Sequence, residues 1–248
     1  MNGGQGLGIV QLIDPFYIRL PDKTFRKISL VGQFCWIPVI HLDPIPRILD
    51  VERADPQEHY ATKFAIRNMT GDDFRKKTRL PIKSLSLRET EELVIHRAKK
   101  RPAIVICAEA TVFDDVETLL LRMGRKHLQE NNVIVAPLYS VESGEHEGGF
   151  PPIMTARIRA LMYRQFFYCP KGNSPLTEDS ILRLDRLQTV IANYPAFIPE
   201  PYALGGEALG VLMAMLRSLF GGKEEADFET LKSLVFESLP DEAKPKSG

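Results

Sequence analysis

The chain has 248 residues, of which 44% are hydrophobic and 26% charged, and its 32 basic residues balance its 32 acidic ones. This length and apolar content predict one or two globular domains with a substantial core. A net charge of zero gives no global argument for nucleic-acid binding, and no apolar run approaches the ~20 residues of a transmembrane helix. The composition therefore argues against a membrane partner and leaves nucleic acid open.

The charge is unevenly distributed along the chain. Residues 223–248 contain four lysines against seven acidic residues, a net charge of −3, so the remainder carries +3. We expect a single domain over 1–222 and an acidic tail, partly helical and partly disordered, over 223–248.

Three cysteines, Cys35, Cys107 and Cys169, each lie in an apolar run. Their odd number and wide spacing suggest neither a disulfide framework nor a zinc site, so we expect buried, reduced thiols. The N-terminal segment has no basic region followed by a small-residue cleavage site. We therefore expect no signal peptide and a cytoplasmic protein.

The first hundred residues predict strands and one irregular insertion. The segment FRKISLVG at 25–32 is compatible with a strand, and the apolar, aromatic segment GQFCWIPV at 32–39 predicts one. Residues 40–100 contain several prolines and a basic run at 74–83. They predict an exposed, partly helical insertion.

The middle of the chain alternates buried strands with other elements. Continuous β-branched runs at 101–107 and 133–140 predict strands. Between them, 112–129 has acidic residues early and basic residues late, which predicts a helix within a second insertion at 109–132. Residues 153–169 are rich in strand-forming residues and predict one or two strands.

The last third contains the clearest helix. Residues 206–219 present an apolar face before Gly221-Gly222, and a shorter helix is expected over 225–239. The segment 179–191 is ambiguous, because its apolar positions also match a helix stripe, and periodicity alone weakly favours a helix.

Four segments, in this order, resemble the MazF/PemK/Kid family of toxins from bacterial toxin–antitoxin modules. They are GQFCWIP at 32–38, RPAIVI at 101–106, VIVAPLYS at 133–140 and SILRLDRLQTV at 180–190, and Pro199-Glu200 and an apolar helix follow them. The resemblance implies an α+β fold: an SH3-like antiparallel barrel with a C-terminal helix, usually a homodimer. It also implies that 180–190 is strand.

The chain departs from the family pattern at several points. The insertions at 40–100 and 109–132 are long, Tyr139 stands where a threonine is expected, and Gln188 stands where an arginine is usual.

The resemblance implies a metal-independent endoribonuclease, without a cofactor, that cleaves single-stranded RNA by attack of a 2′-hydroxyl and is neutralised by a cognate antitoxin. Asp185 and Arg183 align with the family's catalytic Arg-x-Asp as base and as acid or phosphate donor, and Arg101 aligns with its RP arginine. Ser140 would donate to the scissile phosphate. Such a reaction needs a proton acceptor, charge stabilisation and a proton donor.

Each of these residues also has an ordinary interpretation. Arg183 and Asp185 could form a weak surface ion pair on one strand face. Arg101 could be the solvated end of the basic run 97–101, and Ser140 could begin a turn.

Further residues are candidates for RNA contact through stacking or charge. Tyr139 could instead pack in the core, His96 could be an ordinary exposed histidine, and the basic run at 74–83 could be a solvated face. The candidates are Tyr139, His96, Arg75, Lys76, Lys77 and Arg79.

Two other functions stay open. The same barrel could be a non-catalytic module that binds RNA or protein, and the CcdB gyrase poison shares the fold but lacks the RP and Arg-x-Asp pair. Convergence of Arg101, Arg183 and Asp185 on one groove would favour the enzyme.

Overall fold

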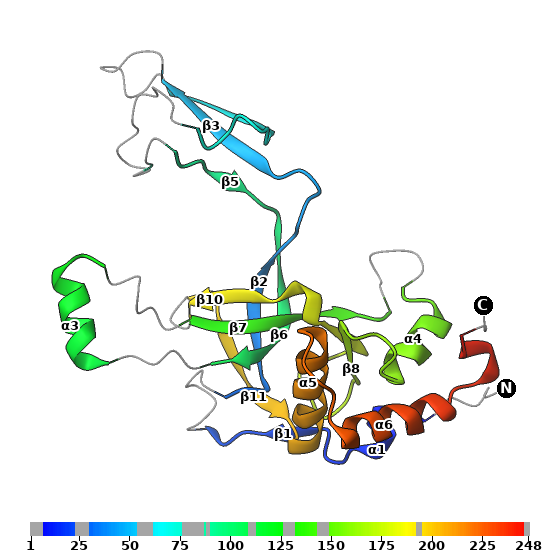
Figure 1. Cartoon of the computed structure of the whole chain (residues 1–248). Coiled ribbons are helices and arrows are strands. Elements are labelled where there is room, and N and C mark those ends of the chain that lie inside the picture. Colours follow the sequence, from blue (N-terminus) through cyan, green and yellow to red (C-terminus); the bar gives the residue numbers. More distant parts are fainter. Residues whose placement is uncertain are drawn as a thin grey trace. The chain divides into compact units, whose positions relative to one another are not determined.

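In a computed structural model the described residues are 7–22, 30–53, 62–75, 87, 90–108, 113–125, 132–142, 149–191 and 195–245. They divide into two compact units (Figure 1). The main unit comprises Met1–Pro38 and Lys100–Gly248, and the inserted unit comprises Val39–Lys99. The described part is a mixed α/β fold with mostly antiparallel strands and five α-helices.

The main unit is built on an eight-stranded sheet of order β1-β11-β2-β6-β7-β9-β8, with β10 also paired to β7 (Figure 1). Its strands are β1 (Tyr17–Arg19), β2 (Gln33–Ile40), β6 (Ala98–Cys107), β7 (Asn132–Ser140), β8 (Phe166–Cys169), β9 (Ser180–Arg183), β10 (Gln188–Ile191) and β11 (Ile198–Leu204). The strands predicted at 32–39, 101–107 and 133–140 are confirmed as β2, β6 and β7. Pairings among the described strands do not close the sheet into a ring.

The segment 180–190 is neither one strand nor a helix. Strand β9 ends at Arg183, a 3₁₀ turn covers Leu184–Arg186, and β10 begins at Gln188. Both strands pair with β7, so the turn carries the chain from one half of β7 to the other. The prediction of a continuous strand is therefore wrong at Asp185.

Residues 153–169 contain a helix as well as a strand. Helix α4 covers Pro152–Arg159, and β8 follows after a short connection. A proline at the first helical position needs no hydrogen-bonded N–H and has a suitable φ, and the helix buries Ile158 completely. Sequence preference for strand is overridden here by packing.

Helices complete the core of the main unit. These are α1 (Ile9–Leu12), α5 (Gly206–Leu219) and α6 (Ala226–Glu237), and a 3₁₀ turn covers Asp241–Ala243. Helix α5 buries Leu212 and Leu216 against sheet residues such as Phe34 and Leu182. Helices are confirmed at 206–219 and, with slightly shorter bounds, at 225–239.

Part of the acidic tail also joins the core, since Phe228, Val235, Leu239 and Ala243 are buried there. The predicted helix at 112–129 is shorter: α3 covers Asp114–Arg122 and buries none of its residues. The segment predicted as a strand at 25–32 lies mostly outside the described residues.

The inserted unit is a small sheet, not a partly helical stretch. Strands β3 (Arg47–Arg53), β4 (Thr62–Asn68) and β5 (Val94–Ile95) pair antiparallel in the order β4-β3-β5. The prediction of helix is wrong over its described residues, because the alternating segment TKFAIRN at 62–68 supplies strand pairing to β3.

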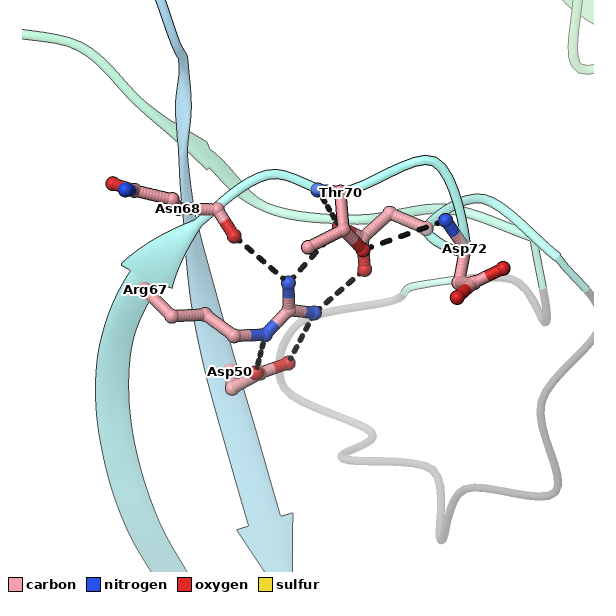
Figure 2. Close-up of polar contacts among 6 residues, drawn as sticks. Asp50, Arg67, Asn68, Thr70 and Asp72 are labelled. Atoms are coloured by element: carbon pink, nitrogen blue, oxygen red, sulfur yellow. Dashed lines mark hydrogen bonds and ion pairs between the residues drawn. The ribbon is translucent and has the colours of Figure 1, made fainter.

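A charged cluster stabilises the inserted unit (Figure 2). The Arg67 guanidinium donates to Asp50 and, at 2.6 and 2.9 Å, to Asp73. The backbone N–H of Thr70 also donates to Asp73 at 2.7 Å. The Asp73 side chain is 2% exposed, so these donors replace the water that a buried carboxylate would otherwise need. The hydrogen bonds to Asp73 and Asp50 raise the pKa of Arg67 above its ordinary value.

Cys35 and Cys169 are buried free thiols, as predicted, but Cys107 is exposed at the end of β6. Burial raises the pKa of both buried thiols. None of the described helices is long and apolar enough to cross a membrane.

Candidate functional site

Three predicted site residues meet across neighbouring strands of the main unit. The guanidinium carbon of Arg101 lies 4.5 Å from the centre of the Tyr139 ring, and that of Arg183 lies 5.8 Å from the same centre. Arg183 also lies 5.1 Å from the centre of the Phe166 ring. We call Arg101, Tyr139, Arg183 and Phe166 the cation–aromatic row.

Strand register explains this convergence. Ala103 in β6 pairs with Pro137 in β7. Because the two strands are antiparallel, Arg101, two residues before Ala103, comes opposite Tyr139, two residues after Pro137. In β9, Arg183 pairs with Phe166 of β8. Tyr139 pairs with Ile181, two residues before Arg183, and side chains two residues apart share a sheet face. Four adjacent strands therefore each contribute one side chain to one face.

Asp185 joins the row through Arg183. Nε and Nη2 of Arg183 donate to the two carboxylate oxygens of Asp185 at 2.7 and 2.6 Å, a bidentate ion pair. The two residues were predicted to lie two apart on one strand, but Asp185 lies in the 3₁₀ turn, so strand geometry does not produce this contact. The turn instead folds Asp185 back toward the end of β9.

The ion pair sets the protonation states of both residues. The hydrogen bonds from Arg183 lower the pKa of the Asp185 carboxyl below its ordinary value, against a smaller opposing effect of burial. The same hydrogen bonds raise the pKa of Arg183. Asp185 is therefore ionised at neutral pH, and Arg183 keeps its proton.

Ser140 is not brought together with these residues. It follows Tyr139 directly in β7 and pairs with Ser180, so alternation places its side chain on the opposite face of the sheet. Its hydroxyl contacts the Glu178 carboxylate and lies 2.6 Å from the carbonyl of Glu142. These contacts explain its position without a substrate.

The remaining predicted RNA contacts belong to the inserted unit. Arg75 pairs with Asp72 across one turn at 2.8 Å. Nδ1 of His96 is buried and has no hydrogen-bond partner among the described residues. Lys76, Lys77 and Arg79 lie outside the described residues.

Sequence reasoning missed Phe166 as a member of the site. It is 7% exposed and belongs to a small apolar cluster with Ile158, Tyr168 and Ile181. An aromatic residue in an apolar run gives no local signal of function. Only the β8–β9 register brings it beneath Arg183.

The chemistry available at the row follows from its charges. Two guanidinium groups and one carboxylate give a net charge of +1. Among the described residues, Arg101 has an aromatic ring as its partner and no ion pair, so its donors are free for an anion. Such planar donors bind phosphate and carboxylate groups through two parallel hydrogen bonds.

Neither the models of known protein families nor curated protein sequences match this chain. Among the described residues, no three His, Cys, Asp or Glu side chains gather as metal ligands would.

Proposed function

We propose that the protein is an endoribonuclease that cleaves single-stranded RNA without a metal ion, through the cation–aromatic row and Asp185. The observation that carries this proposal is the convergence of Arg101, Arg183 and Asp185 around Tyr139. A surface ion pair alone would need neither the aromatic ring nor the second arginine. An RNA phosphate with its neighbouring base would use all four groups.

The reaction is a transesterification. Asp185 accepts the proton of a ribose 2′-hydroxyl, whose oxygen attacks the adjacent phosphorus while the bond to the 5′-oxygen breaks. The same proton can then return from Asp185 to the leaving 5′-oxygen. The products are a 2′,3′-cyclic phosphate and a 5′-hydroxyl.

Both arginines stabilise the phosphorane in this scheme. Arg101 is free to bind the phosphate first, and Arg183 adds charge when its donors turn from Asp185 toward the phosphate oxygens. That movement also removes the hydrogen bonds that lower the pKa of Asp185, so the carboxylate becomes a stronger base when the substrate is bound. Arg183 serves charge stabilisation rather than proton donation, because a guanidinium group stays protonated in proteins.

The proposal extends to fold and partners. The four family-like segments lie in β2, β6, β7, β9 and β10. Of these strands, β2, β6, β7 and β9 are consecutive in the sheet, and β10 pairs with β7; we propose that they form the SH3-like barrel of a homodimer. A cognate antitoxin would cover the positive row with an extended acidic segment. Wild-type expression in a bacterium without antitoxin should then slow growth, whereas Asp185→Asn should not.

A non-catalytic RNA-binding module is the second candidate. It is favoured by one observation: Ser140 faces away and Asp185 is fully engaged by Arg183, so the row is already a complete binding surface. Gyrase poisoning gains no support from the row.

One experiment separates the two. Purified protein is incubated in EDTA with RNA and with a DNA oligonucleotide of the same sequence. The enzyme should cut only RNA and leave cyclic phosphates. Binding without cutting would favour the module, and cutting that requires magnesium would refute the proposed mechanism.

A further inference from the structure

The aromatic surface continues beyond Phe166. The ring of Tyr163 lies 5.6 Å from that of Phe166, with the planes tilted by 41°, and the ring of Phe150 meets Phe166 edge-on at 6.2 Å. Phe166 is buried, but Tyr163 and Phe150 are only half-buried. The row thus ends at aromatic rings that water can reach.

Tyr163 has an unused polar group. Within the described ranges its hydroxyl has no hydrogen-bond partner, and because Tyr163 is only half-buried, the side chain is open to water. Tyr163 lies in the connection between α4 and β8. Its ring can therefore receive a ligand without displacing a hydrogen bond of the fold.

Position relates Tyr163 to the reaction site. The row crosses β6, β7, β9 and β8, which at the usual interstrand spacing is ~14 Å. The ring of Tyr163 lies beside Phe166, the ring at the Arg183 end of the row. A strand of RNA whose phosphate lies between the two arginines would continue over Tyr163.

We propose that Tyr163 stacks on the base of a nucleotide next to the scissile phosphate. This inference rests on the proposed function, because it assumes that the row binds RNA. Guanidinium groups alternate with rings from Arg101 to Phe166, and Tyr163 adds a second, more accessible ring beside Phe166, while phosphates alternate with bases in a single strand. Because every base has a flat face, Tyr163 contributes to affinity and not to the choice of sequence.

The test measures binding without cleavage. The probe is a fluorescein-labelled 2′-O-methyl adenosine octamer, which has no free 2′-hydroxyl, and its affinity is read by fluorescence anisotropy. Tyr163→Leu keeps apolar contact with Phe166 but removes the ring, and it should weaken binding about tenfold. Tyr163→Phe keeps the ring and should bind like the wild type.

A second probe isolates stacking from structure. It is the same octamer with abasic sugars, which keeps every phosphate. Tyr163→Leu should bind this probe as the wild-type protein does. An equal loss on both probes would show that Tyr163 acts only by supporting the fold, and it would overturn the inference.

Failure of the inference differs from failure of the proposed function. If Arg101→Ala weakens binding of the adenosine octamer while Tyr163→Leu does not, Tyr163 is no stacking residue although the row still binds RNA. If the wild-type protein does not bind the octamer, both are refuted.

Discussion

Arg183 donates two parallel hydrogen bonds to Asp185, at 2.7 and 2.6 Å, across the single residue that separates them. The contact exists because β9 ends at Arg183 and the next three residues form a 3₁₀ turn. The side chain of Arg183 is 23% exposed and that of Asp185 is 36% exposed. Such a partly exposed pair contributes only ~0.2–1 kcal/mol to stability.

The first prediction concerns the protonation of Asp185. Arg183→Met should raise the pKa of the Asp185 carboxyl toward its ordinary value of ~3.9, because hydrogen bonds from Arg183 are the main cause of its lowering. Carbon-13 NMR titration of that carboxyl measures the shift. Arg186→Met is the control, because Arg186 has the smallest influence on this pKa.

The lowered pKa of Asp185 makes the stability of the fold depend on pH. Since the folded-state pKa is lowered, the ion pair stabilises the fold at pH values above the unfolded pKa of ~3.9. That contribution is lost as pH falls through the folded-state pKa. If the Asp185 carboxyl titrates at the same pH in wild type and Arg183→Met, the ion pair is not formed in solution.

The second prediction concerns Arg101 and its neighbour Lys100. Both lie in β6 and carry the same charge, but adjacent side chains point to opposite faces of the sheet, and Arg101 is the one that contacts Tyr139. Arg101→Ala should weaken binding of a single-stranded RNA about tenfold and lower the salt slope by ~0.7, as expected for one lost phosphate contact. Lys100→Ala should change little. Equal effects of the two substitutions in binding titrations would mean that only overall charge matters.

The third prediction concerns the start of helix α5. A Cβ atom at Gly205 would lie 2.1 Å from the carbonyl oxygen of Pro15, whereas one at Gly206 would have no heavy atom within 4 Å. Gly205→Ala should therefore destabilise the main unit by ~1–3 kcal/mol. Gly206→Ala, within the helix, should be neutral or stabilising by up to ~1 kcal/mol. Urea unfolding measures both, and an unchanged Gly205→Ala midpoint would refute this close packing.

The fourth prediction concerns the buried carboxylate of the inserted unit (Figure 2). Asp73→Ala removes the carboxylate that accepts hydrogen bonds from both the Arg67 guanidinium and the Thr70 N–H. Hydrogen exchange in β3 and β4 should become about tenfold faster or more. Asp72→Ala is the matched control, because the Asp72 side chain is 81% exposed and forms an ion pair with Arg75 one turn away. Similar exchange in both variants would show that Asp73 is dispensable.

Local patterns predicted the elements whose residues face a core. Continuous apolar runs identified β6 and β7, and the apolar face of α5 identified its bounds as Gly206 and Leu219. The same patterns failed where packing decides, as in α4, and where strand pairing decides, as in the inserted unit. Turn geometry at Asp185 and the position of Phe166 beneath Arg183 depend on pairing between distant segments, which one sequence does not display.

The site residues were likewise predicted by local motifs, but their arrangement depends on strand pairing. Motif order pointed to Arg101, Arg183, Asp185 and Tyr139. Cross-strand register brings Arg101, Tyr139 and Arg183 together, and the 3₁₀ turn adds Asp185. Ser140 was selected by the same motif as Tyr139, but alternation along β7 turns it to the other face.

The rate of RNA cleavage by Asp185→Asn, measured in EDTA beside wild type and Ser140→Ala, tests the central claim most directly. Asparagine keeps the shape of Asp185 but cannot accept the 2′-hydroxyl proton, so its rate should fall by ~10²–10⁴. Ser140→Ala should retain nearly the full rate, because Ser140 lies on the opposite face from Tyr139. Wild-type cleavage that leaves 2′,3′-cyclic phosphates, together with loss of cleavage in Asp185→Asn, is the predicted result. Undiminished cleavage by Asp185→Asn, or no metal-independent cleavage by the wild type, would contradict it.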